Sequence, residues 1–466
     1  MPPPEFSRAL SALDRALPSG AVITDPDVCE AYARDESEAE PELPEAVVRV
    51  STTAQVSAAL EVAHAHAVPV TPRAAGSGRS GGAVPVRGGW VISFDRFDGI
   101  DEVHRDDAVC VVRPGTVLGD VHAAVEAEGL FYPPDPNSAA YCTIGGNLAE
   151  NAAGPRAFKY GVTRDYVLGL EVVLADGRVL SVGRRTKKGV TGYDLVALMV
   201  GSEGTLGLIT RATLHLIPAP EAVRTMAVHL GAERDMASAV SACLRARVVP
   251  RCVEVMDATT LGLLREAGVP TPAATRALLI VEVDGTATQA DADLERLGGA
   301  LLDAGALDVS VAKHGGDRER LWSARREMSR SLRTLAAHKL SEDVVVPRSR
   351  LAALLSRVRE ISDAQAIRMP AYGHAGDGNL HVNFLWDTPD EKPRVDAAIR
   401  ALFESVVALG GTLSGEHGIG ALKAPYLGLE QSDALIDVQR ALKATLDPKG
   451  ILNPGKIFPR VGHGAC

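Results

Sequence analysis

The stretch from Tyr372 to Phe384, YGHAGDGNLHVNF, constrains the fold more than any other part of this chain. Its glycines exclude a regular helix, because glycine weakens helices and favours tight turns. From Asn379 onward polar and apolar residues alternate, which is the period of a strand with one buried face. We therefore expect a strand preceded by a tight turn, with His374 folded back beside His381.

A second stretch, SGEHGIG at 414–420, adds a carboxylate to this pair of histidines. Two neutral imidazoles and one carboxylate form the open ligand set of catalytic zinc, which leaves a position for substrate. The candidate metal ligands are His374, His381 and Glu416, and manganese or iron would also accept this set. A lone histidine is more often an ordinary core or surface group, so the prediction depends on the combination. His417, beside Glu416, is the candidate catalytic base.

Composition narrows the class of protein. With 466 residues and 46% apolar composition, the chain can form more than one large core. A formal net charge of −10 argues against a nucleic-acid partner, because phosphate binding requires a basic face. The sequence shows no signal-peptide pattern and no apolar run long enough to cross a membrane. We therefore expect a cytoplasmic protein, which would reach the inner membrane only through a partner.

The cysteines give no sign of a cluster. The six, at positions 29, 110, 142, 243, 252 and 466, show no C-x-x-C spacing. That pattern offers no basis for an iron–sulfur cluster, a cysteine zinc site or a disulfide framework. Any iron–sulfur cluster would therefore belong to a partner.

A glycine-rich loop follows a β-α-β opening, for which we expect strands at Val47–Val50 and Val68–Pro72 around a helix at Thr53–Ala67. In PRAAGSGRSGGA, small side chains would let successive backbone N–H groups surround a diphosphate. The glycine spacing is not a dinucleotide fingerprint, and no P-loop lysine follows. A flexible surface loop is the alternative. The candidate ligand-binding residues of this loop are Pro72, Arg73, Ala74, Ala75, Gly76, Ser77, Gly78, Arg79, Ser80 and Gly81.

Two further runs of small residues lie in the same region. TIGGNLAENAAG at 143–154 follows PPDP at 133–136, and GSEGTLGLIT occupies 201–210. We expect the run at 143–154 to be a second loop that holds the same extended ligand. A strand at Val109–Val112 and a hairpin over Leu170–Val182, with a helix at Val117–Glu128, make this domain α+β.

The order of these runs resembles the FAD-binding domain of the vanillyl-alcohol oxidase and p-cresol methylhydroxylase (PCMH) flavoprotein superfamily. HAGDGNLH and GEHGIG match the metal motifs of the branch with D-lactate dehydrogenase, the glycolate oxidase D subunit and D-2-hydroxyglutarate dehydrogenase. The resemblance spans almost the whole chain and implies one bound FAD. Relatives with covalent flavin place a histidine in or beside the first loop, where this chain has Ala83, so noncovalent FAD is implied.

The family pattern also implies which residues hold FAD. The loop at 73–83 and the run at 143–154 would hold the pyrophosphate, and Glu203–Ile209 would line the adenosine or the flavin. The C-terminal segment folds back toward the flavin in relatives, so Asn453 would contact FAD or cap a turn. Outside the first loop the candidates are Asp135, Thr143, Gly145, Gly146, Asn147, Asn151, Gly154, Glu203, Gly204, Gly207, Ile209 and Asn453.

The expected fold is α+β, with a two-subdomain PCMH-type FAD-binding domain, an α+β substrate-capping domain and a C-terminal helical segment. The expected domains are a helical lead-in at 1–44, the FAD-binding domain at 45–220, the substrate- and metal-binding cap at 221–425 and a returning segment at 426–466. In the cap, strands near Ala227–Leu230, Cys252–Met256 and Leu278–Val283 alternate with helices at 232–246 and 288–304.

A helix expected over Glu319–Ala337 carries an arginine within its apolar stripe. A buried Arg325 needs an anion, which is either a protein carboxylate or a substrate carboxylate held by two hydrogen bonds. In the family an arginine three positions after a tryptophan, as Arg325 follows Trp322, holds the substrate carboxylate. Lys339 and Asn383 are the other candidate substrate-binding residues.

The resemblance predicts FAD- and metal-dependent oxidation of a D-2-hydroxy acid to the 2-oxo acid. D-Lactate is the favoured substrate, with glycolate and D-2-hydroxyglutarate as alternatives. Electrons would leave the flavin for a quinone, a cytochrome, an electron-transfer flavoprotein or an iron–sulfur subunit rather than for NAD, because no dinucleotide fingerprint is present. The alternative functions are a non-catalytic FAD-bearing subunit of a larger oxidase and a non-redox flavin-dependent transferase. The oligomeric state stays open, with a homodimer as one option.

Overall fold

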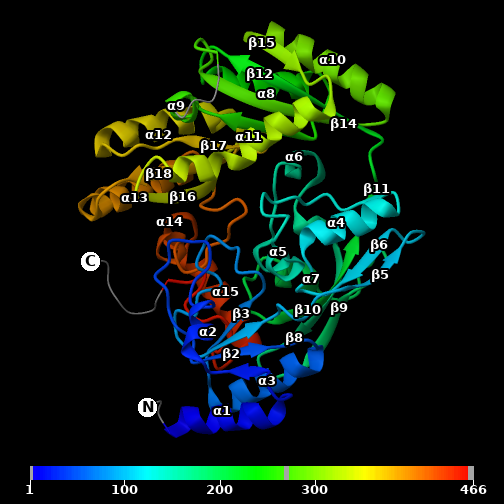
Figure 1. Cartoon of the computed structure of the whole chain (residues 1–466), viewed down its shortest axis with the longest axis vertical. Helices are drawn as coiled ribbons and strands as arrows, with labels where there is room; N and C mark the ends of the chain where they lie inside the picture. The colour runs from blue at the N-terminus through cyan, green and yellow to red at the C-terminus, as the bar shows by residue number, and fades with distance from the viewer. Residues whose placement is uncertain (1–3, 267–271, 460–466) are drawn as a thin grey trace. The chain divides into compact units, whose positions relative to one another are not determined.

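The computed structural model describes residues 4–266 and 272–459, which form two compact units (Figure 1). Unit 1 combines the described residues up to 153 with 162–219 and those from 416 onward, and unit 2 combines 154–161 with 220–415. The lead-in expected as a separate segment belongs to unit 1, and the return to unit 1 begins at 416, before the expected boundary at 425. Cys466 lies outside the described residues, and the other five cysteines are buried and form no disulfide with one another.

The first sheet of unit 1 has the order β1-β2-β4-β3. Strands β2, β4 and β3 are parallel, and β1 joins β2 antiparallel. The runs AVVR and WVIS of β2 and β4 are buried nearly throughout, as expected for parallel strands that are covered on both faces. The elements are α1 (Pro4–Ala16), β1 (Val22–Ile23), α2 (Pro26–Glu30), β2 (Ala46–Arg49), α3 (Thr53–His66), β3 (Val70–Arg73) and β4 (Trp90–Ser93).

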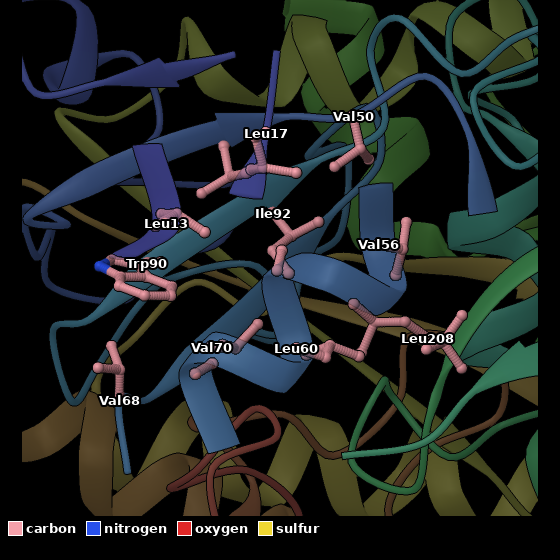
Figure 2. Packing of buried hydrophobic residues seen from close by; sticks show 14 of the residues in the cluster. Leu13, Leu17, Val50, Val56, Leu60, Val68, Val70, Trp90, Ile92 and Leu208 are labelled. Atoms are coloured by element: carbon pink, nitrogen blue, oxygen red, sulfur yellow. The ribbon is translucent and has the colours of Figure 1, made fainter. Parts of the chain in front are cut away.

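The core of this sheet explains why the lead-in is not separate. Leu13 of helix α1 and Leu17, which follows the helix, belong to a cluster with Leu60 from α3 and Trp90 and Ile92 from β4 (Figure 2). These side chains are almost fully buried, and burying each stabilises the fold by about 1.5–3 kcal/mol. Helix α1 and Leu17 therefore complete the core of unit 1.

The second sheet of unit 1 is antiparallel, with the order β5-β6-β10-β8-β9. A short pair, β7 with β11, lies apart from it. The elements are β5 (Ile100–His104), β6 (Val109–Val112), α4 (Leu118–Ala127), β7 (Leu130–Phe131), α5 (Ile144–Glu150), η1 (Thr163–Tyr166), β8 (Val167–Val173), β9 (Val179–Gly183), α7 (Leu195–Met199), β10 (Leu208–His215), β11 (Ile217–Pro218), η4 (Ala424–Tyr426), α14 (Leu427–Glu430) and α15 (Asp433–Leu446).

Unit 2 is built on a seven-stranded antiparallel sheet with the order β15-β12-β14-β13-β17-β18-β16. The elements are α6 (Ala157–Tyr160), β12 (Ala222–Leu230), α8 (Asp235–Arg245), β13 (Cys252–Met256), α9 (Ala258–Glu266), β14 (Ala277–Gly285), α10 (Ala287–Asp303), β15 (Ala306–Val311), α11 (Gly315–Arg333), β16 (His338–Val345), η2 (Arg348–Arg350), α12 (Leu351–Gln365), β17 (Ala371–His374), β18 (Asn379–Trp386), η3 (Pro389–Glu391) and α13 (Lys392–Ala408). The expected α+β class is confirmed.

One expectation about local structure is wrong. The run at 143–154 was expected to be a loop, but residues Ile144–Glu150 form helix α5. Its glycines serve close packing, since a Cβ at Gly145 would lie 2.8 Å from the Cβ of Pro114. The helix ends at Asn151, whose backbone takes the left-handed conformation that terminates many helices. Among the described residues, no helix is long and apolar enough to span a membrane.

Candidate metal and flavin sites

The expected pair of histidines lies on two neighbouring strands of unit 2. Strands β17 and β18 are antiparallel, with Tyr372 opposite His381 and His374 opposite Asn379. Gly378 in the turn has φ of +85°, and a Cβ there would overlap the carbonyl of Val346. As a result the Nε2 atoms of the two histidines are 3.4 Å apart, and the rings are nearly perpendicular.

Each histidine has a buried carboxylate behind it. Nδ1 of His374 is 2.5 Å from Oε1 of Glu254, and Nδ1 of His381 is 3.8 Å from Oδ1 of Asp343. Metal-binding histidines commonly face a carboxylate with the ring nitrogen that does not bind the metal. With Nδ1 turned to a carboxylate on both rings, the two Nε2 atoms are presented to a common point.

The charge of Glu254 suits this role. Burial alone would raise the pKa of its carboxyl, but His374 and Arg325 outweigh burial and hold the pKa below its ordinary value. An ionised carboxylate accepts a hydrogen bond from Nδ1–H of His374. The imidazole then carries its lone pair on Nε2, which is the atom that faces His381.

Asp343 connects the histidine strand to the SGEHGIG stretch. Its carboxylate accepts hydrogen bonds from Nδ2 of Asn379 at 2.5 Å, from the backbone N–H of Gly415 at 2.8 Å and from Oγ of Ser414 at 3.2 Å. Glu416 follows Gly415 directly in the chain, so Asp343 is bonded to the backbone that leads to the third candidate ligand. Two imidazole nitrogens and a carboxylate oxygen are donors that zinc and similar divalent metals accept, so these residue types fit a divalent metal.

The candidate substrate-binding residues have partners within the protein. Nη2 of Arg325 lies 2.7 Å from Oε2 of Glu254, and its guanidinium is 4.8 Å from the ring centre of Tyr372. The sequence left two partners open for Arg325, a protein carboxylate or a substrate carboxylate. The structure shows the first, which is Glu254. Nζ of Lys339 donates to Oγ of Ser329 at 3.2 Å.

Asn383 is the third candidate substrate-binding residue and is fully buried. Its Nδ2 donates to the carbonyls of Pro370 and His381. Oδ1 of Asn383 and Nε of Arg325 have no hydrogen-bond partner within the part of the chain that the structure describes. Each atom is therefore available to a ligand.

Sequence reasoning missed the two carboxylates behind the histidines. Glu254 is the one charged residue of the buried strand CVEVM. Asp343 follows Glu342 and directly precedes three valines. A charge within a buried apolar run needs a partner, and that signal was present in both places. Which partner it finds depends on strand order, because β13 and β16 lie on opposite sides of the β17–β18 pair.

In unit 1 the three glycine-rich runs meet. A Cβ at Gly146 of α5 would be 3.9 Å from the Cβ of Ala74, and one at Gly82 would be 3.0 Å from Oε1 of Glu150. Gly204 packs on Pro72, where a Cβ would overlap the proline ring. The structure therefore brings parts of all three runs together.

Polar atoms around these runs fit a polar ligand. Oγ of Ser80, Oγ1 of Thr143 and Nδ2 of Asn147 are buried and have no hydrogen-bond partner among the described residues. A buried polar atom without a partner is costly, so such a group usually meets a ligand or water. This observation fits bound FAD near α5 and the first loop.

Several other residues expected to hold FAD also have partners within the protein. Nη1 of Arg73 donates to the carbonyl of Arg34 at 2.7 Å, and burial lowers the pKa of Arg73. Nη2 of Arg79 lies 3.8 Å from Glu36. Oδ1 of Asn151 accepts from the N–H of Arg164 at 2.8 Å. Among the remaining candidates, Asp135 and Ile209 of β10 are half-buried, and Gly207 packs on Val172. Gly154 belongs to unit 2. Nδ2 of Asn453 donates to the carbonyls of Gly82 and Glu203.

Comparisons with known proteins agree with this arrangement. A family model described as an FAD binding domain matches residues 44–183, and a model described as the C-terminal domain of FAD linked oxidases matches residues 219–457. The glycolate oxidase subunit GlcD of Bacillus subtilis is 39% identical over 432 residues, covering 92% of each chain. The D-lactate dehydrogenase of Archaeoglobus fulgidus is 37% identical over 419 residues, covering 89% of this chain and 91% of that protein.

Solved structures agree on the fold. The structure of p-cresol methylhydroxylase with substrate bound superimposes with a TM-score of 0.85 at 18% identity, covering 97% of this chain and 96% of that one. The expected PCMH-type fold is therefore confirmed. With both family models matched and the relatives similar over nearly their full length, the chain belongs to the FAD-linked oxidases and is an FAD-dependent oxidoreductase.

Proposed function

We propose that this chain oxidises a small D-2-hydroxy acid to the 2-oxo acid. D-Lactate is the favoured substrate, and glycolate and D-2-hydroxyglutarate are the alternatives. The names of the similar proteins, a glycolate oxidase subunit and a D-lactate dehydrogenase, support this class of substrate. The observation that carries the proposal is the pair of Nε2 atoms 3.4 Å apart, each on a ring with a buried carboxylate behind it.

The proposal includes a divalent metal on His374, His381 and Glu416. Zinc is the first choice, and Mn²⁺ or Fe²⁺ suits the same nitrogen and oxygen donors. When bound, the metal would act as a Lewis acid toward the substrate hydroxyl, and FAD would serve as the hydride acceptor. Glu254 and Asp343 would orient the two imidazoles with Nε2 toward the metal and increase their basicity as ligands.

His417 would accept the proton of the substrate hydroxyl. It is half-buried and follows the proposed ligand Glu416 in the chain. Histidine suits this step because its ordinary pKa, about 6.5, lies near the operating pH. Proton removal by His417 would accompany the loss of hydride from C2 of the substrate.

Arg325, Lys339 and Asn383 would bind the substrate. The positive charges of Arg325 and Lys339 would attract its carboxylate, and Arg325 has an Nε atom without a partner among the described residues. Oδ1 of Asn383 could accept a hydrogen bond from a substrate hydroxyl. Holding the carboxylate at a fixed place would select one face of C2, and hence the D configuration.

Electrons would then leave the flavin for a partner. A quinone, a cytochrome, an electron-transfer flavoprotein and an iron–sulfur subunit are the candidates. The Bacillus relative is named as a subunit, which supports an acceptor on another chain.

A substrate panel under anaerobic conditions tests the proposal. The purified protein, loaded with FAD and zinc, is mixed with D-lactate, L-lactate, glycolate or D-2-hydroxyglutarate, and flavin absorbance is followed. We expect D-lactate to bleach the flavin and L-lactate to leave it oxidised. Dithionite provides the control that the flavin can be reduced. If dithionite bleaches the flavin but none of the hydroxy acids does, the proposed substrate class is wrong.

A further inference from the structure

The SGEHGIG stretch is held at its far end by a carboxylate from a distant part of unit 1. Oε1 of Glu203 accepts the backbone N–H of Ile419 at 2.8 Å, and Oε2 accepts that of Gly420 at 2.7 Å. Glu203 is only 6% exposed, and its backbone lies in the left-handed region at φ of +52°. A non-glycine residue in that region is uncommon, so the surrounding contacts must maintain the conformation.

The same end of the stretch is bonded to the first glycine-rich loop. The carbonyl of Ser80 accepts the backbone N–H groups of Ala421 at 2.9 Å and of Leu422 at 3.1 Å. Gly420 has φ of +52°, and a Cβ there would overlap that carbonyl. Only glycine therefore allows the backbones of the stretch and the loop to approach this closely.

The C-terminal segment completes the arrangement. Nδ2 of Asn453 donates to the carbonyls of Glu203 at 2.7 Å and Gly82 at 3.0 Å, and the N–H of Ile457 donates to the carbonyl of Gly420 at 2.9 Å. Four segments that are distant in sequence thus share one hydrogen-bond network. Glu203 is the residue that contributes both a side-chain carboxylate and a backbone carbonyl to it.

Charge favours Glu203 as the ionised member of a carboxyl pair. Burial raises the pKa of Glu203, and the N–H groups of Ile419 and Gly420 oppose that rise. Burial and the neighbouring Glu203 raise the pKa of Glu150 well above its ordinary value. Asp35 also faces Glu150, while Lys423 and Lys456 act on both carboxyls. Of the two carboxyls, Glu150 therefore has the stronger tendency to keep a proton, which favours Glu203 as the carboxylate that accepts both N–H groups.

We propose that Glu203 is a positioning residue that sets the place of Glu416 and His417 relative to the first glycine-rich loop. Asp343 holds residues 414–415 within unit 2, and Glu203 holds residues 419–420 within unit 1, so Glu416 and His417 lie in the chain between two hydrogen-bonded segments. Because Ser80 belongs both to the loop and to this network, occupancy of the loop by FAD and the order of the stretch are coupled. The roles of Glu416 and His417 rest on the proposed function, whereas the anchoring itself does not.

Hydrogen–deuterium exchange of the FAD-loaded full chain tests the anchoring without metal or substrate. Exchange in peptides covering 416–422 is compared among wild type, Glu203→Ala and Glu203→Gln. We expect the amides of Ile419 and Gly420 to exchange at least tenfold faster in Glu203→Ala. Glu203→Gln should give an intermediate rate, because its amide keeps one acceptor oxygen, and it keeps the test valid if Glu203→Ala does not fold.

Glu171→Gln is the matched control. Glu171 is a half-buried carboxylate of unit 1 that accepts hydrogen bonds from the hydroxyls of Thr53 and Thr210 and not from the stretch. We expect this variant to leave exchange at 416–422 unchanged. Exchange that stays within twofold of wild type in both Glu203 variants, or that rises equally in the control, would overturn the anchoring.

Metal retention tests the positioning of Glu416. In the zinc-loaded protein, Glu203→Ala should release zinc to a chelator at least tenfold faster than wild type, and Glu203→Gln should restore part of the difference. Equal release from wild type and Glu203→Ala, with faster exchange at 419–420, would contradict the positioning role. Failure of wild type to bind zinc would instead refute the proposed metal site, and the exchange experiment would still decide the anchoring.

Discussion

Nδ1 of His374 lies 2.5 Å from Oε1 of Glu254, the residue directly opposite it on the neighbouring strand β13. Both side chains are almost completely buried. Oε2 of Glu254 lies 2.7 Å from Nη2 of Arg325, so this one carboxylate contacts both His374 and Arg325. Glu254 therefore determines which nitrogen of His374 carries the proton, and thus which nitrogen is available to a metal.

Replacing Glu254 with glutamine should weaken zinc binding by about ten- to a hundredfold, the usual effect of losing the carboxylate behind a metal-binding histidine. Glutamine keeps the size of the side chain but removes its negative charge. Zinc affinity is measured by competition with a chelator. The variant should also unfold more easily, by about 3–5 kcal/mol, because Arg325 loses its buried partner.

Glu282→Gln is the control for this prediction. Glu282 is equally buried in the same sheet, but it accepts hydrogen bonds from Trp322, Arg318 and Thr225 and not from the histidines. It should lower stability without changing zinc affinity. Equal loss of zinc affinity in both variants would show that general destabilisation, not the loss of the His374 contact, is the cause.

His417→Asn tests the proposed base. We expect the variant to keep FAD and zinc and to bind an inert substrate analogue nearly normally. Flavin reduction by D-lactate should slow by about two to four orders of magnitude, the range typical of general-base removal. Stopped-flow absorbance measures this rate. A loss below about tenfold, or one explained by missing zinc, would mean that His417 is not the base.

FAD should be released when the protein is precipitated with acid. The first loop has Ala83 where relatives with covalent flavin place a histidine, and the buried polar atoms near α5 can bind FAD without a covalent bond. The supernatant should contain one FAD per chain by chromatography. Yellow colour that remains with the washed pellet would contradict noncovalent binding.

In the Glu150→Gln variant, the free energy of unfolding should decrease less than in wild type as pH rises above about 4.5. Burial and Glu203 raise the pKa of Glu150 in the folded protein well above its ordinary value of 4.5. Between those two pKa values the folded state binds more protons than the unfolded state, so stability decreases with increasing pH. Glutamine cannot titrate and removes this contribution. Thermal unfolding of both proteins across pH measures the difference, and parallel curves would contradict the prediction.

Sequence patterns predicted the local structure around the histidines well. Alternation from Asn379 predicted β18, although both faces of this strand are buried and not one face as expected. The glycines before it predicted the turn that places His374 beside His381. Both signals are local, because side-chain alternation and glycine conformations depend on neighbours in the chain. The strand Cys252–Met256 was predicted with the bounds that the structure shows.

Features that depend on distant segments could not be predicted. Glu254 and Asp343 reach the histidines only because β13 and β16 flank the β17–β18 pair. Glu203 was expected to line FAD, but its carboxylate is bonded to Ile419 and Gly420, more than two hundred positions away. No local pattern encodes which strand or loop becomes a neighbour, so these contacts require the tertiary structure.

The most direct test of metal-dependent oxidation is the rate of a single anaerobic flavin reduction by D-lactate, before and after metal removal. The protein is treated with a chelator, flavin content is checked, and half of the sample is reloaded with zinc. We predict that the stripped protein keeps its FAD but reduces it at least a hundredfold more slowly, and that zinc restores the original rate. Reduction at the original rate in protein shown to contain FAD but no metal would contradict the proposed mechanism.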